Sequence, residues 1–166
     1  LFTITEETGV GASHGLHGDV SELLAVDNGT IAPDQNTSEY GVTIAMQDSS
    51  GPFDYYLSRR LTGLCETFDI DCARDVFRYY RSDAAAALEA GNDIRTALAC
   101  FALDSSHGYE RTHERSLTAL ARLLALYMQT HALFEHDHLT MDERHDLPQD
   151  QGDWSDPGLS EETSEG

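Results

Sequence analysis

The sequence contains no lysine, few cysteines and no long apolar segment. All 10 of its basic residues are arginine, and 30 acidic residues oppose them, so the 166-residue chain carries a formal net charge of −20 at pH 7. A surface of this sign repels nucleic acid and anionic membranes alike. No apolar run approaches the ~20 residues that a membrane-spanning helix needs. We therefore expect neither nucleic acid nor a membrane as a partner.

The 3 cysteines, Cys65, Cys72 and Cys100, are odd in number and form no Cys-x-x-Cys pair. A disulfide framework would use an even set at short spacings, so reduced thiols in a cytoplasmic protein are expected. No charged segment followed by an apolar one opens the chain, as a secretion signal would. The first residue is Leu1 rather than Met, which we interpret as the start of a fragment of a longer gene product.

Predicted strands alternate with predicted helices along the first 134 residues. Apolar runs predict strands at residues 1–5, 22–27, 41–48, 75–80 and 94–103. Amphipathic or alanine-rich patterns predict helices at residues 52–70, 82–92 and 112–131. The last helix should bury one stripe, which consists of Leu117, Leu120, Leu124 and Met128. This order predicts an α/β domain with a largely parallel or mixed, buried sheet flanked by helices.

The composition changes near residue 135. Residues 135–166 are dominated by acidic and small polar side chains with little apolar periodicity. Such a segment buries too little apolar surface to offset its ordering entropy. We expect a folded domain at residues 1–134 and a disordered acidic tail at residues 135–166.

Acidic and imidazole side chains occur where the predicted strands end. Glu6 and Glu7 follow the first strand, Asp27 ends the second, Asp83 follows residues 75–80, and His107 follows the last strand. Functional residues of open α/β sheets gather at the carboxyl ends of strands. Carboxylates and an imidazole arriving from separate strands suit zinc, cobalt or manganese. Of two adjacent glutamates, one can ligate a metal while the other acts as a general base; a solvated strand end is the alternative.

Other side chains have simpler interpretations. His14 and His17 lie in a glycine-flanked stretch and are either loop residues or metal ligands. His113 is either a second candidate ligand or the first residue of a helix. No Gly-x-Ser-x-Gly elbow supports a serine hydrolase. Cys65 and Cys100 occupy apolar positions, which is typical of inert core thiols.

Several segments resemble, in the same order, the C-terminal half of a metallopeptidase of the tetrahedral-aminopeptidase group, among the co-catalytic zinc exopeptidases. They are TEETGVGASHGL, LLAVDNGTIAPDQN, VTIAMQDSSGPFDYYL, RDVFRYYRSDAAAALEAGNDIRTAL and SSHGYERTH. The similarity spans residues 1–127. Within the group, it is closest to the branch found in bacterial clusters for the osmoprotectant N-acetylglutaminylglutamine amide.

This resemblance implies a role for each candidate residue. It implies that Glu6 is the general base, that Glu7, Asp27 and His107 are metal ligands, and that Asp83 lies near the active site. It also implies two divalent metal ions, zinc or cobalt, whose bound water hydrolyses an N-terminal peptide bond or a small amide. Members of the group form large homo-oligomers, so a homo-oligomer is implied here.

The sequence also departs from the family pattern. Thr8 replaces the valine that usually follows Glu-Glu, and DSSHGYE replaces the usual Arg-Tyr-x-His-Ser around the last histidine. In the family, three features precede the Glu-Glu motif: the first metal-binding histidine, the bridging aspartate and an inserted dimerisation domain. None of the three is found in the 166 residues of this sequence. The chain alone is therefore expected to be inactive. A competing hypothesis is a non-catalytic acidic α/β module for binding or assembly.

Overall fold

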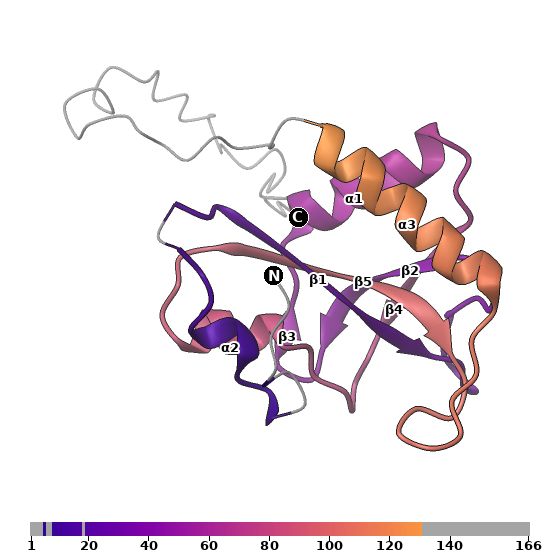
Figure 1. Cartoon of the computed structure of the whole chain (residues 1–166), viewed down its shortest axis with the longest axis horizontal. Coiled ribbons are helices and arrows are strands. Elements are labelled where there is room, and N and C mark those ends of the chain that lie inside the picture. Colours follow the sequence, from indigo (N-terminus) through magenta and orange to yellow (C-terminus); the bar gives the residue numbers. More distant parts are fainter. Residues whose placement is uncertain (1–4, 6–7, 18, 131–166) are drawn as a thin grey trace, which may run out of the picture. The chain divides into compact units, whose positions relative to one another are not determined.

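The computed structural model describes residues 5, 8–17 and 19–130, all within the unit Leu1–His136. A five-stranded sheet lies between helices (Figure 1). In chain order the elements are the 3-10 turn η2 (Gly11–Ser13), β1 (Glu22–Thr30), β2 (Val42–Asp48), β3 (Gly51–Pro52), α1 (Tyr55–Thr67), β4 (Cys72–Val76), α2 (Ala84–Glu89), β5 (Arg95–Leu103) and α3 (Glu114–Gln129). The predicted α/β class, with a sheet flanked by helices, is confirmed.

The sheet is mixed. Its strand order is β1-β5-β2-β3, and β4 also pairs with β2. The β1–β5 and β2–β4 pairs are parallel, whereas β2 runs antiparallel to both β5 and β3. The carboxyl ends of β1 and β5 therefore lie at the opposite end of the sheet from those of β2 and β4. The expectation that all strand ends meet at one edge is wrong, because it assumed that the strands run in one direction.

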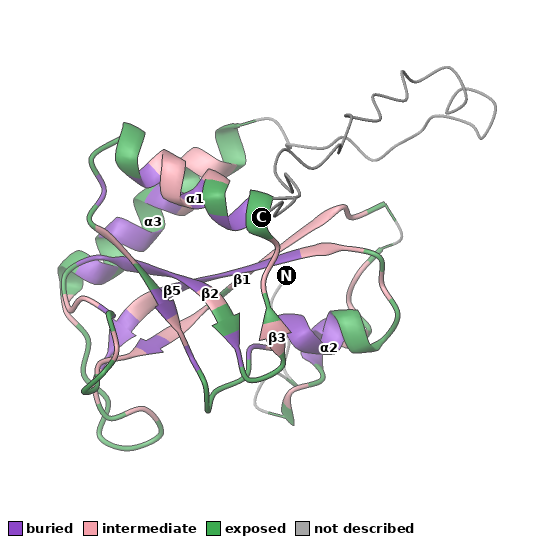
Figure 2. Cartoon of the chain, turned by 180° about the vertical axis from the view of Figure 1, so that it is seen from behind, coloured by how far each residue is buried: buried purple, intermediate pink, exposed green. Residues whose placement is uncertain are grey.

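The two faces of the sheet carry different helices. Helices α1 and α3 cover one face, and the short helix α2 lies on the other (Figure 1). Side chains of β5 alternate accordingly: Ala97 and Ala99 pack in the core beneath α1 and α3, whereas Leu98 and Cys100 join a smaller apolar cluster on the α2 face. The central strands are the most buried part of the domain (Figure 2).

The inward face of α3 differs from the predicted stripe. Leu120 is buried and Leu124 packs against the core, as expected. Leu117 and Met128, however, are 44% and 77% exposed, and Leu123 is fully buried in their place. Helix α3 is therefore turned about its axis relative to the prediction. The buried Ser116 explains this orientation, because its Oγ accepts a hydrogen bond from Ala102 N and donates one to Gly41 O, each at 2.7 Å. These bonds attach the first turn of α3 to the sheet.

The predicted strand at residues 75–80 is also wrong beyond Val76. A bulge in β2 disturbs its pairing with β4 between Ala45 and Gln47, and β4 ends at Val76. Residues 77–82 form a loop with a bend at Arg78 and Tyr79, and Tyr80 O accepts a hydrogen bond from Ser49 N at 2.9 Å. Of the strand expected at residues 1–5, only Thr5 is described, and it lies in a turn.

The acidic segment expected at residues 135–166 lies outside the described residues. Within the described part of the chain, no helix combines the length and apolar character needed to cross a membrane.

Candidate functional site

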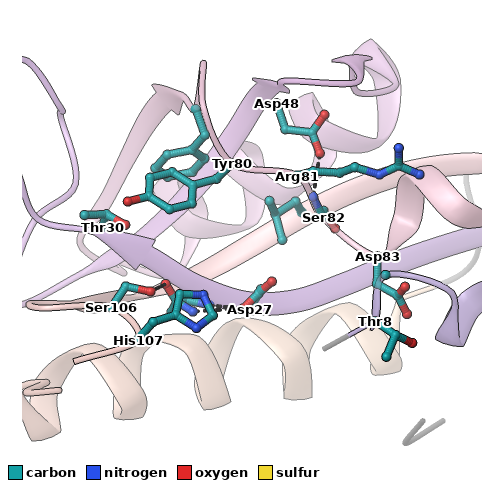
Figure 3. Close-up of a pocket in the computed structure, with 14 residues that line it drawn as sticks. Thr8, Asp27, Thr30, Asp48, Tyr80, Arg81, Ser82, Asp83, Ser106 and His107 are labelled. Atoms are coloured by element: carbon teal, nitrogen blue, oxygen red, sulfur yellow. Dashed lines mark hydrogen bonds between the residues drawn. The ribbon is translucent and has the colours of Figure 1, made fainter. Parts of the chain in front are cut away.

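One pocket on the α2 face of the sheet brings together the candidate residues that the structure describes. It has a volume of about 360 Å³, and the apolar side chains of Phe77 and Leu98 form part of its lining. The polar and small residues around it include Thr8, Gly9, Asp27, Asn28, Thr30, Asp48, Tyr80, Arg81, Ser82, Asp83, Ser106 and His107 (Figure 3). Asp27, Asp83 and His107 therefore share one cavity.

Asp27 reaches this pocket from a strand face rather than from a strand end. It pairs in register with Cys100 inside β1, three residues before that strand ends at Thr30. Ala25 packs on the α2-face cluster, and alternation along a strand directs Asp27 to the same face. The Asp27 Oδ1 atom accepts hydrogen bonds from Asn28 N at 2.7 Å and from Asn28 Nδ2 at 3.1 Å. These contacts fix the carboxylate at the pocket wall.

His107 lies in a loop that continues from β5. Asp104 and Arg111 close this loop through two backbone hydrogen bonds of 2.8 and 3.1 Å. Ser105 and His107 have φ angles of 60° and 62°, a left-handed conformation that is uncommon outside glycine and is often found at functional sites. The His107 backbone N donates to Glu110 Oε1 at 2.9 Å, while the exposed imidazole lines the pocket.

Asp83 connects the pocket to the N-terminal segment. It precedes α2 but does not cap it; Ser82 Oγ instead accepts a hydrogen bond from Ala84 N at 3.2 Å. The Asp83 Oδ2 atom accepts from the backbone N of Ala12 in η2, at 2.9 Å. Its Oδ1 atom is buried and has no hydrogen-bond partner among the described residues. A buried carboxylate oxygen without a partner is energetically costly, which makes this oxygen a candidate ligand atom.

Asp48 is a pocket residue that the sequence analysis missed. It follows the bulge of β2 and is only 1% exposed. Its Oδ1 atom accepts hydrogen bonds from the backbone N of Ser50 at 2.8 Å and from the Ser50 hydroxyl, and its Oδ2 atom accepts from Ser82 N at 2.8 Å. Asp48 thus holds the residue next to Asp83. An aspartate followed by serines at the end of a strand is a turn signature and could have identified it.

The two candidate histidines of the 107–113 segment lie in different places. His113 is the N-cap of α3, where its Nδ1 atom accepts a hydrogen bond from Arg115 N at 3.1 Å. It lines a separate pocket with Asp71 and Arg122. His107, and not His113, therefore shares a cavity with Asp27. His14 is exposed, contacts Ser13 through its Nδ1 atom and does not line the pocket.

The donor types in this pocket fit a divalent transition metal. Aspartate oxygen and histidine nitrogen are the ligands that zinc takes besides cysteine, and Asp83 offers a buried oxygen that lacks a partner within the described chain. No three His, Cys, Asp or Glu side chains of the described residues are close enough together to hold an ion. Glu6 and Glu7 lie outside the described residues. In the sequence they directly precede Thr8, which lines the pocket.

The cysteine beneath the pocket, Cys100, occupies a buried apolar position, as predicted. Cys100 is fully buried, and burial raises the pKa of its thiol, with a further contribution from the Asp27 carboxylate. Cys65 is buried in the core beneath α1 and α3. All three thiols are free.

The family model for M42 glutamyl aminopeptidase matches residues 1–123. The chain belongs to this family. It is 42% identical over 130 residues to the putative aminopeptidase YhfE of Bacillus subtilis (strain 168), and the match covers 78% of this chain and 38% of YhfE. The chain thus spans less than half the length of that relative.

Solved structures share the fold at low sequence identity. Aminopeptidase APDkam598 from the archaeon Desulfurococcus kamchatkensis superposes with a TM-score of 0.65 at 20% identity, covering 75% of this chain and 39% of the other. The TET1 peptidase of Pyrococcus horikoshii, which assembles into a tetrahedron or a large octahedral shell, gives a TM-score of 0.62 at 23% identity, covering 76% and 38%. These matches show that the chain shares the fold of part of each of those structures.

Proposed function

We propose that this chain is the C-terminal part of the catalytic domain of a metal-dependent aminopeptidase, which hydrolyses N-terminal peptide bonds or small amide bonds. One observation carries the proposal: Asp27, Asp83 and His107, from three separate segments, line one pocket in a member of an aminopeptidase family. Thr8, which directly follows Glu7, lines the same pocket. Residues 1–134 would form the catalytic part, and residues 135–166 an acidic tail.

Each residue has a proposed task. Glu7, Asp27 and His107 would ligate two divalent ions, zinc or cobalt. When bound, such ions polarise a carbonyl and lower the pKa of water. Glu6 accepts the proton of the attacking water and returns it to the leaving amine. Asp83 holds the segment that follows Glu6 and Glu7, through its hydrogen bond to Ala12.

The proposed enzyme is larger than this chain. The family's upstream histidine and bridging aspartate would complete the metal site, so the 166-residue chain alone should be inactive. The assembly of the Pyrococcus relative supports a homo-oligomer. We also propose a cytoplasmic location and, from the sequence motifs, membership of the branch linked to N-acetylglutaminylglutamine amide.

Replacement of Glu6 tests this function in the gene product that contains the sequence. Glu6→Gln removes the general base without altering the shape of the side chain, and the rate of hydrolysis of N-terminal residues from short peptides should fall by about 10²–10⁴-fold. The matched control is Glu66→Gln, at an exposed position on α1, which should retain wild-type activity. Unchanged activity in Glu6→Gln would contradict the proposal.

The competing function is the non-catalytic acidic module. The absence of a three-ligand cluster among the described residues favours this alternative. Metal analysis separates the two. A gene product that carries no transition metal when purified without chelator, and that hydrolyses no peptide, would favour the module.

A further inference from the structure

A second pocket, of about 710 Å³, adjoins the pocket that holds Asp27 and His107. Thr30, at the end of β1, and Tyr80 line both pockets, so the two share part of their walls. Figure 3 shows these two side chains at one side of the first pocket. The second pocket has about twice the volume of the first, which measures about 360 Å³. A peptide bound in the first pocket can therefore extend past Thr30 and Tyr80 into the second.

The walls of the second pocket are held in place by the buried carboxylate of Asp75 in β4. Its Oδ2 atom accepts hydrogen bonds from the backbone N of Asn36 at 2.8 Å and of Thr37 at 3.1 Å. Its Oδ1 atom accepts from Val76 N at 2.8 Å. The side chain of Asn36 also donates to Arg74 O, at 3.1 Å. Both oxygens of Asp75 are thus occupied, and the loop that contains Asn36 and Thr37 is attached to β4.

Two arginines of the second pocket have no partner on the described part of the protein. Arg74 and Arg78 are exposed, and their side chains form no hydrogen bond or ion pair with the described residues. Each of the other arginines that the structure describes contacts an acidic side chain, a hydroxyl, a backbone carbonyl or an aromatic ring. Acidic residues outnumber arginines by 30 to 10 in this chain, so a shortage of carboxylates does not explain the two exceptions.

The acidic residues of the second pocket do not neutralise these arginines. Asp34 and Asp75 line the pocket, yet neither forms an ion pair with Arg74 or Arg78. Asp75 is 5% exposed, and its oxygens face backbone amides. Guanidinium groups bind carboxylates through paired N–H donors. The two arginines are therefore available to a carboxylate of a peptide that enters from the first pocket.

We propose that Arg74 and Arg78 bind a carboxylate of the leaving part of the peptide substrate. The proposal rests on the aminopeptidase function proposed above. The N-terminal residue occupies the smaller pocket, beside Asp27 and His107, and the chain beyond the scissile bond continues into the larger one. The carboxylate belongs either to an acidic side chain at the second residue of the peptide or to the C-terminus of a short peptide. Peptides with such a group bind more tightly than their amide counterparts.

Three pairs of tripeptides identify the carboxylate. The first pair is Leu-Glu-Ala amide and Leu-Gln-Ala amide, the second is Leu-Ala-Ala as free acid and as amide, and the third is Glu-Ala-Ala amide and Gln-Ala-Ala amide. Dissociation constants are measured by calorimetry on the Glu6→Gln form of the gene product that contains the sequence, in which hydrolysis should be slow. We expect the carboxylate to improve binding by about fivefold or more in the first or the second pair.

The double substitution Arg74→Gln and Arg78→Gln should remove this preference and leave the affinity for the amide peptides unchanged. Both side chains are exposed, so the fold should persist. The matched control is Arg59→Gln, at an exposed position of α1 where the guanidinium donates to Tyr55 Oη, and it should retain the preference. No carboxylate preference in the first two pairs, a preference that survives the double substitution, or a change confined to the third pair would overturn the proposal.

Hydrolysis of Leu-Ala-Ala amide by the gene product with Glu6 intact separates this proposal from the proposed function. Hydrolysis together with equal affinities within each pair would support the aminopeptidase and overturn the carboxylate subsite. A preference that the double substitution abolishes, without any hydrolysis, would support the subsite and contradict the aminopeptidase.

Discussion

The two faces of the sheet use the same strands for different purposes. Beneath α1 and α3 the buried cluster is apolar, and it includes Ile44, Leu61 and Leu123. On the opposite face, the smaller cluster of Ala45, Phe77, Leu98 and Cys100 borders a pocket lined by carboxylates. Alternation along each strand separates the two environments by a single residue. One face stabilises the fold, and the other is free to carry ligand-binding groups.

The buried carboxylates of the described residues differ in how many of their oxygens accept hydrogen bonds. Asp48 accepts hydrogen bonds with both oxygens. Asp75 Oδ2 accepts from the backbone N of Asn36 and of Thr37, and its Oδ1 accepts from Val76 N. Asp83 Oδ1 and Glu22 Oε1 both lack a partner within the described chain. Glu22 binds Arg60 and Tyr127 through its other oxygen and does not line the pocket, whereas Asp83 does. Asp83 is therefore the pocket residue with a buried carboxylate oxygen that has no partner within the described chain.

The largest effect on stability should come from the face of the sheet that α1 and α3 cover. Leu123→Ala removes a fully buried side chain from α3 and should lower the free energy of unfolding by about 2–5 kcal/mol. Leu117→Ala, on the same helix but 44% exposed, should cost less than about 1 kcal/mol. Urea unfolding of both variants measures the difference. A loss at Leu117 as large as that at Leu123 would contradict this orientation of α3.

A smaller effect is expected from Asp48 on the pocket face. Asp48→Asn keeps the size of the side chain but replaces one acceptor oxygen by a donor, which then faces another donor, Ser82 N or Ser50 N. The variant should lose about 1–3 kcal/mol of stability. Asp93→Asn, at an exposed position, is the matched control and should be neutral. If the Asp48 variant unfolds like wild type, Asp48 does not hold the Asp83 segment.

The smallest expected effect is the pH dependence of stability that Tyr127 of α3 produces. Burial raises the pKa of Tyr127, and its 2.7 Å hydrogen bond to the Glu22 carboxylate adds to the increase. The unfolded chain therefore releases this proton first, near its usual pKa of about 10, so the contribution is present below about pH 10 and is lost as the pH rises. Tyr127 is only half-buried, which limits the effect to under about 1 kcal/mol.

Unfolding measured between pH 8 and pH 11 (roughly the range around the tyrosine pKa) tests this sign. Stability of Tyr127→Phe should fall less steeply with pH than that of wild type. Tyr109→Phe, at a 96% exposed position, should follow the wild-type slope. A Tyr127 variant with the wild-type slope would show that this tyrosine is not the titrating group.

Local sequence patterns predicted most elements but not their orientation. The helix over residues 52–70 is observed as α1, with Asp54 Oδ1 accepting from Leu57 N at its N-cap. The rotation of α3 was mispredicted, because hydrogen bonds of Ser116 to Ala102 and Gly41 set it. Those partners are distant in the sequence, so no local periodicity contains them. Strand direction was likewise not predictable from local patterns, because it depends on which strands pair with one another, and β1 and β5, for example, are distant in the sequence.

The candidate site was partly predictable. The sequence selected Asp27, Asp83 and His107, and the structure places all three around one pocket. The prediction that all three follow strand ends at one edge of the sheet is wrong. Asp27 lies inside β1, and its side chain faces the pocket because side chains alternate between the two faces of a strand. Asp48 was missed because its importance comes from a contact with Ser82, 34 residues away. The roles of Glu6 and Glu7 remain predictions.

Metal binding tests the central claim most directly. Calorimetric titration of the gene product that contains the sequence with Zn²⁺ and Co²⁺ is compared for wild type, Asp27→Asn, His107→Ala and His113→Ala. We expect the first two substitutions to weaken binding at least about tenfold, as loss of a ligand does, and His113→Ala to leave it unchanged, because His113 lines another pocket. Equal affinities in all four proteins, or a loss confined to His113→Ala, would contradict the proposed site.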